Sequence, residues 1–184
     1  MRHAAALLLL VLAAPSCSTE TVDAKVQAQK AFEDWVHTCI DGESMKVFHS
    51  LSDGYKSGWL FDRFREGDTT FKRWRAELSG TARTDLDLWL GVAKMHDDGR
   101  TEGLPSDVLL HPSFTQLFSE YFIRTHDGIK VQMSRYQIAK VYGDNSGVTI
   151  VVKNGLSSTE MYGLIYERDG WKIDAYRQPL TGGR

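Results

Sequence analysis

The stretch MYGLIYERDGWKID, Met161–Asp174, predicts two β-strands joined by a tight turn. Apolar and aromatic residues dominate 161–166, and Trp171 and Ile173 then alternate with polar residues. Between the two runs, Arg168-Asp169-Gly170 has the composition of a hairpin turn. The segment therefore predicts an antiparallel hairpin with one face turned toward a hydrophobic core.

Outward from this hairpin, the sequence predicts further strands. Residues 148–153 are rich in β-branched residues, and Asn154-Gly155, which follows, is a strong hairpin signal. After His126-Asp127-Gly128 the apolar period changes from helical to alternating, and a phase slip before Tyr136 is typical of a β-bulge. We expect four strands, 129–142, 148–153, 159–167 and 171–176. Their connections are too short for parallel pairing, so the strands should form an antiparallel meander.

The N-terminal half predicts helices. Apolar residues recur at helical spacing over 24–40, with Phe32 and Trp35 among them, and Asp41-Gly42 ends the pattern. A short second helix should follow and end at Asp53-Gly54. Residues 55–124 are also mostly helical but less regular, with Asp68 or Thr69 as one helix cap.

Helices followed by a curved antiparallel sheet make an α+β fold. In this order, the helical hairpin 31–51 and the ending Met161–Asp174 resemble the NTF2-like (SnoaL-like, cone-fold) superfamily. The resemblance implies N-terminal helices packed on a four-stranded cone, within a single domain over 25–178. The middle section, about 55–124, is then an enlarged helical insertion, and 179–184 form a C-terminal tail. Because this superfamily includes isomerases, dehydratases and transport factors, the resemblance implies no single activity.

The first 17 residues have the features of an export signal. Arg2 supplies a positive charge, an apolar run covers 4–14, and small residues precede Cys17. The apolar run is shorter than the about 20 residues that a membrane-spanning helix needs. The end of the signal resembles a bacterial lipobox, although Ala14 and Pro15 depart from its preferred residues. We expect a signal peptide over 1–16, lipid attachment at Cys17, and an anchor and tether over 17–24.

These features place the protein in a bacterial cell envelope, held at a membrane by the lipid. Ser18 is not aspartate, which favours the outer membrane over the inner one in bacteria that use aspartate as a retention signal. The alternative is an ordinary secreted or periplasmic protein that is cleaved near Ser16.

The charge of the chain argues against a nucleic-acid-binding protein, and its cysteine content argues against an internal disulfide. The chain has 22 Lys and Arg against 24 Asp and Glu, so the net charge of −2 predicts no nucleic-acid partner. The one basic cluster, 72–75, is flanked by acidic residues and fits a solvated helix face. If Cys17 carries lipid, Cys39 has no disulfide partner within the chain and should pack as a small buried hydrophobe.

A pocket between the sheet and the first helix is the natural candidate site in a cone fold. Trp35 on the helix and strand residues Tyr136, Tyr162 and Tyr166 are candidates for its lining, with Tyr162 and Tyr166 on one face of their strand. The resemblance to ketosteroid-isomerase-like enzymes implies a further possibility at Asp174 and Tyr176. There a carboxylate would shuttle a proton and a hydroxyl would stabilise an oxyanion. The alternative is that Asp174 faces water on a half-buried strand.

No metal site or cofactor is expected. The histidines are scattered without metal-ligand spacing, and Asp97-Asp98-Gly99 lacks the alternating acidic pattern of a calcium loop. Phosphate-binding and dinucleotide-binding motifs are absent from the sequence.

The sequence favours a non-catalytic envelope protein that binds a small apolar ligand or a protein partner. Exposure of Trp59, Phe61 or Trp74 would favour the protein partner. The alternative is an isomerase or dehydratase with an Asp/Tyr pocket. A homodimer through the sheet is a third possibility, because Ala139 and Val141 suggest that both sheet faces are covered.

Overall fold

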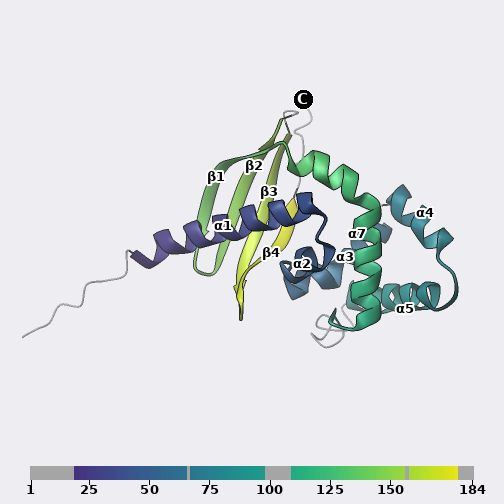
Figure 1. Cartoon of the computed structure of the whole chain (residues 1–184). Coiled ribbons are helices and arrows are strands. Elements are labelled where there is room, and N and C mark those ends of the chain that lie inside the picture. Colours follow the sequence, from purple (N-terminus) through teal and green to yellow (C-terminus); the bar gives the residue numbers. More distant parts are fainter. Residues whose placement is uncertain (1–18, 66, 98–108, 156–157, 178–184) are drawn as a thin grey trace, which may run out of the picture.

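The computed structural model describes residues 19–65, 67–97, 109–155 and 158–177, and it is an α+β structure (Figure 1). Over these residues six helices and one sheet are present. The helices are α1 (Thr19–Asp41), α2 (Ser44–His49), α3 (Asp53–Arg65), α4 (Thr69–Glu77), α5 (Gly80–Asp97) and α7 (Pro112–Met133). The strands are β1 (Tyr136–Asp144), β2 (Gly147–Asn154), β3 (Ser158–Glu167) and β4 (Gly170–Arg177).

The four strands form an open antiparallel sheet in the order β1-β2-β3-β4. Consecutive strands pair with each other, so the predicted antiparallel meander is confirmed. The turn at 144–147 and the turn at 167–170 lie at one end of the sheet, and the β2–β3 connection lies at the other end. The sheet does not close on itself.

The predicted start of the first strand at residue 129 is wrong. Residues 129–133 are the last turns of α7, and Figure 1 shows that this helix bends on its way to β1. The alternating apolar residues 129, 131 and 133 predicted a strand, but Ile129 and Met133 are also four residues apart, which places them on one face of a helix. Met133 is buried and Ile129 packs against the core, whereas Val131 is 54% exposed.

The β1 bulge also lies later than predicted. The register between β1 and β2 shifts between Ile138 and Lys140, so Ala139 is the extra residue. The extra residue leaves Ala139 exposed and brings Val141 into phase with Ile138, both of which pack against the core. The inference from Ala139 and Val141 that both sheet faces are covered is therefore wrong.

Helix α1 covers one face of the sheet. Its residues Ala28, Phe32 and Val36 are fully buried, at the spacing that places them on one side of a helix. The helix begins at Thr19, so residues 19–24, expected as a tether, are its first turns. Cys17 and the signal segment lie outside the described residues.

The second predicted helix is shorter than expected. Helix α2 ends at His49, and Asp53-Gly54 begins α3 instead of ending α2. Between the helices, Leu51 bridges to Ile173, with Ser52 N donating to Ile173 O at 2.9 Å and Ile173 N donating to Ser50 O at 2.9 Å. These bonds satisfy part of the outer edge of β4, which an edge strand otherwise leaves open.

Helices α3, α4 and α5 pack around α7, beyond the C-terminal end of α1 (Figure 1). Asp68 caps α4 by accepting a hydrogen bond from Phe71 N at 3.0 Å, as predicted. Trp59 and Trp74 are 8% and 3% exposed and belong to the core, while the side chain of Phe61 lies outside the described part. The two tryptophans therefore do not form an exposed partner surface.

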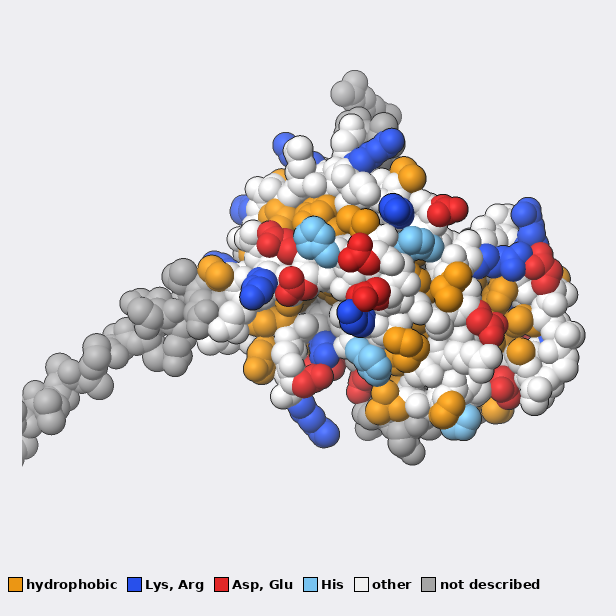
Figure 2. All heavy atoms as spheres, viewed as in Figure 1, with side chains coloured by type: hydrophobic (Ala, Val, Ile, Leu, Met, Phe, Trp, Pro, Cys, Tyr) orange, Lys and Arg blue, Asp and Glu red, His pale blue; other side chains and the backbone are white. Residues whose placement is uncertain are grey.

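No described helix combines the length and the apolar character needed to cross a bilayer. Figure 2 shows acidic and basic side chains intermixed on the α1 side, so the described residues form no large patch of one sign there.

Candidate functional site

Aromatic side chains fill the space between α1 and the sheet. The ring of Phe32 lies 5.0 Å from that of Tyr162, 5.8 Å from that of Tyr136 and 5.7 Å from that of Trp35. The rings of Trp35 and Tyr162 are 5.5 Å apart. Such centroid distances are those of packed aromatic pairs. Three of the four predicted pocket residues, Trp35, Tyr136 and Tyr162, are thus brought together as a packed cluster.

The fourth predicted pocket residue lies elsewhere. Tyr166 is 59% exposed, and its ring packs edge-on against Trp171 at 5.6 Å. Although it shares a strand face with Tyr162, it lies beside the 167–170 turn.

The environment of Tyr136 shifts the pKa of its phenol upward. Desolvation raises the pKa of the Tyr136 phenol, and the nearby charge of Glu33 raises it further. Both effects disfavour the charged phenolate in this setting.

A buried carboxylate that the sequence did not single out lies beside this cluster. Glu160 is 4% exposed and shares the α1-covered face of β3 with Tyr162. Its oxygens accept hydrogen bonds from Tyr162 Oη at 2.9 Å, from Gln132 Nε2 at 3.2 and 3.3 Å, and from Asn154 Nδ2 at 3.5 Å. These three donors come from β3, α7 and β2, so the carboxylate links three elements. In the sequence, Glu160 stands two residues before Tyr162, and this spacing predicts that both side chains lie on the same face of the strand.

Two buried polar atoms near these elements have no hydrogen-bond partner among the described residues. They are the indole nitrogen of Trp35 and the side-chain oxygen of Asn154. Asn154 donates to Glu160 with its amide nitrogen, and its oxygen remains available as an acceptor.

Of the predicted Asp174–Tyr176 pair, the structure describes the side chain of Asp174. The register between β3 and β4 shifts between Gly163 and Leu164, and Asp174 is the extra residue on β4. Ser52 Oγ donates to Asp174 Oδ1 at 2.6 Å, which ties this carboxylate to the segment before α3. Tyr176 pairs with Tyr162 in register, but its side chain is outside the described part. The carboxylate–tyrosine pair seen on the α1-covered face is Glu160 with Tyr162.

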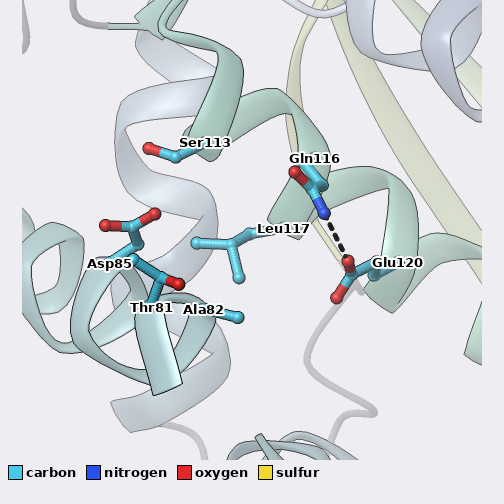
Figure 3. A pocket seen from close by; sticks show the side chains of 7 residues that line it. All are labelled: Thr81, Ala82, Asp85, Ser113, Gln116, Leu117 and Glu120. Carbon is cyan, nitrogen blue, oxygen red and sulfur yellow. Dashed lines mark hydrogen bonds between the residues drawn. The ribbon is translucent and has the colours of Figure 1, made fainter. Parts of the chain in front are cut away.

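A small cavity of about 150 Å³ lies between α5 and α7 (Figure 3). Polar groups make up most of its lining, and Gln116 Nε2 donates to Glu120 Oε1 at 2.9 Å across one side. Ligand pockets are commonly about 300–1,000 Å³ and mostly apolar. This cavity is therefore too small and too polar for the apolar ligand expected from the sequence. Its lining residues are Thr81, Ala82, Asp85, Ser113, Gln116, Leu117 and Glu120.

Among the described residues, histidine, cysteine and carboxylate side chains do not gather in groups of three or more that could hold a metal ion. Cys39 is 1% exposed, and burial raises the pKa of its thiol to about 12. A protonated, shielded thiol is a poor nucleophile and a poor metal ligand.

Comparison of the chain with models of known protein families gave no match. Searches of curated proteins and of solved structures also gave no match. The candidate site therefore has to be interpreted from its own chemistry.

Proposed function

We propose that this protein is an exported bacterial lipoprotein, held at the outer membrane through Cys17, which binds a protein partner and does not catalyse a reaction. We also infer that its domain is NTF2-like. The order of elements supports this inference, since a long first helix lies on an antiparallel meander of four strands with two bulges.

The packed interior is the single observation that favours a protein partner over a small ligand. In a ligand-binding cone, the space between the first helix and the sheet holds the ligand. Here Phe32, Trp35, Tyr136 and Tyr162 occupy that space with rings 5.0–5.8 Å apart. A ligand would have to displace side chains whose burial stabilises the fold, at about 3–5 kcal/mol for a phenylalanine.

The open face of the sheet offers the partner surface. We use this name for the strand residues that point away from α1, namely Thr149, Val151, Met161, Gly163, Ile165 and Ala175. Each is partly exposed, whereas the residues between them on β2 and β3 are largely buried under the helices. A face of this composition, without a covering layer among the described elements, is suited to contact with another protein.

Charges on β1 and β2 suggest the chemistry of the partner. Lys140 is opposite Val151 in register, Lys153 is one row away, and both lysines are exposed. The Lys140 ammonium lies 5.7 Å from the ring of Tyr142, whose hydroxyl reaches Met161 Sδ at 3.7 Å. We therefore expect a partner surface that is apolar at its centre and acidic opposite the two lysines.

Site-specific photo-crosslinking in the native bacterium tests this proposal. A benzophenone amino acid at Val151 should give a covalent adduct of one discrete mass, whereas the same probe at Leu88, 59% exposed on α5, should give none. The double change Lys140→Glu and Lys153→Glu should remove the Val151 adduct. An adduct only at Leu88 would contradict the proposed surface. An adduct of twice the chain mass would identify the homodimer as the assembly instead.

The pair Glu160–Tyr162 favours a second candidate, an isomerase or dehydratase. A buried carboxylate next to a tyrosine hydroxyl is the chemistry of proton transfer beside an oxyanion. For catalysis, the aromatic cluster would have to open and admit a substrate. Crystal soaks with planar ketones such as steroids distinguish the two candidates, since ordered ligand density beside Glu160 would favour the enzyme and an unchanged ring cluster would favour the binding protein.

A further inference from the structure

The position of Cys17 relative to α1 limits how far the domain can lie from a membrane. Only Ser18 separates Cys17 from Thr19, the first residue of α1. Two residues span at most about 7 Å. A lipid on Cys17 would therefore hold the start of α1 close to the bilayer surface, because only Ser18 lies between them in the sequence.

The same end of the molecule carries the β1–β2 turn. Hydrogen bonds from Ser146 lower the pKa of the Asp144 carboxyl, and the ammonium of Lys25 contributes a smaller effect, so the turn lies near the start of α1. Figure 1 shows the same arrangement, with the β1–β2 turn beside the N-terminal half of α1. The β3–β4 turn lies at this end of the sheet too, because the strands are antiparallel.

Exposed side chains at this end suit a lipid interface. Val26 on α1 is 62% exposed, and Tyr166, next to the β3–β4 turn, is 59% exposed. Tyrosine is enriched where hydrocarbon meets water, because its ring is apolar and its hydroxyl is polar.

We propose that the hairpin end of the domain rests on the leaflet that holds the Cys17 lipid. The hairpin end consists of the first two turns of α1 with Val26, the 144–147 turn, and Tyr166 with the 167–170 turn. This inference rests on the proposed lipid anchor. It adds an orientation, in which the end of the sheet at Asn154 and the α4–α5 section point away from the membrane.

Fluorescence quenching on vesicles measures this orientation. The lipidated chain is reconstituted into phosphatidylethanolamine–phosphatidylglycerol vesicles that contain brominated lipid, a short-range quencher. One variant carries a maleimide dye at Asn145→Cys and the other at Thr159→Cys. Both positions are exposed. They lie about 20 Å apart along the sheet, since Lys153, the partner of Thr159, is six residue steps along β2 from Gly147. Cys39 should not take up dye, because it is buried and its thiol pKa is about 12.

The proposal expects strong quenching of the dye at 145 and little at 159. Val26→Glu with Tyr166→Glu should reduce the quenching at 145 to the level at 159 while the chain still sediments with the vesicles. Leu88→Glu, equally exposed at 59%, is the matched control and should change neither result. Equal quenching at 145 and 159 on bound vesicles would overturn the orientation alone. Failure of the wild-type chain to carry lipid and to sediment with vesicles would overturn the anchor and the orientation together.

Discussion

At the scale of single residues, Glu160 joins the end of α7 to two strands through its carboxylate oxygens. Glu160→Ala should lower the free energy of unfolding by about 3 kcal/mol, because the buried Tyr162 hydroxyl and the partly buried amides of Gln132 and Asn154 lose this acceptor. Glu160→Gln keeps one acceptor oxygen and should cost about 1 kcal/mol. Urea unfolding monitored by tryptophan fluorescence measures both values.

The neighbouring change Thr159→Ala is the control for this series. Thr159 is exposed on the opposite strand face and should alter the free energy of unfolding by less than about 0.5 kcal/mol. If Glu160→Ala behaved like Thr159→Ala, the carboxylate would not be the link described above.

Cys39 offers a second test at this scale. Its thiol pKa is raised from 9.0 to about 12 by burial, so in the folded chain the thiol stays protonated at pH 8. Reaction with a disulfide reagent at pH 8 should therefore be limited by unfolding, and it should accelerate sharply in denaturing urea. Immediate reaction in the folded protein, at the rate of the exposed thiol in Asn145→Cys, would contradict the burial of Cys39.

The same shift predicts how stability depends on pH. Below pH 9 both the folded and the unfolded chain hold the proton, and the stability associated with the protonated thiol is fully present. Above pH 9 the unfolded chain releases the proton first, so stability falls as the pH rises toward about 12. The variant Cys39→Ser should show a smaller decline between pH 9 and 11 than the wild type in parallel urea titrations. An identical decline in both proteins would mean that Cys39 does not contribute.

At the scale of elements, a substitution at Gly128 tests whether α7 continues as a helix through this residue. Gly128 is a helix-interior residue with open space around its Cα. Gly128→Ala should therefore raise the free energy of unfolding by about 0.5–1 kcal/mol, the difference in helix propensity. A loss of stability in the same thermal and urea measurements would indicate a turn at this point instead of a helix.

Gly143 gives the opposite expectation. Its φ of 126° is unfavourable for other residues, and an added Cβ would overlap the carbonyl oxygen of Gly147. Gly143→Ala should cost about 2 kcal/mol or more, because the tight β1–β2 turn would have to shift. The pair of variants separates a helical glycine from a required turn glycine within one chain.

Local patterns explain which elements could be predicted. Strands β2, β3 and β4 combine alternating residues with turn residues such as Asn154-Gly155 and Asp169-Gly170, and all of these signals act over a few residues. Residues 129–133 fit a strand and a helix equally well, because five residues are too few to separate the two periods. The bulges at Ala139 and Asp174 depend on pairing with another strand, which a single strand does not encode.

Part of the candidate site could also be predicted from local sequence patterns. Trp35 and Tyr162 lie on the apolar faces of elements that the sequence predicts correctly, and Tyr136 joins them although the predicted start of its strand is wrong. The bonds from Gln132 to Glu160 require Gln132 to be helical, whereas the sequence pattern predicted a strand there. Asp174 is the bulged residue of β4, and its hydrogen bond with Ser52 Oγ joins positions far apart in the sequence, which the pattern of a single strand does not predict.

At the scale of the whole molecule, the packed aromatic cluster and the open sheet face are features of one rigid layer, and a single residue separates Cys17 from α1 in the sequence. In the arrangement that we propose, the lipid on Cys17 holds the hairpin end at the membrane and leaves the open face of the sheet accessible to a partner. A solid interior suits a protein that presents surfaces, because it keeps those surfaces rigid without a bound molecule.

Native mass spectrometry of the mature protein, released from bacterial membranes in mild detergent, tests the central claim most directly. The account predicts a polypeptide that begins at Cys17 and carries the added mass of acyl chains, with no small molecule bound after detergent removal in the gas phase. The variant Cys17→Ser, which should lose the acyl mass, is the control. A polypeptide without acyl chains would contradict the anchor, and a retained small-molecule mass would contradict the packed interior and favour a ligand-binding protein or enzyme.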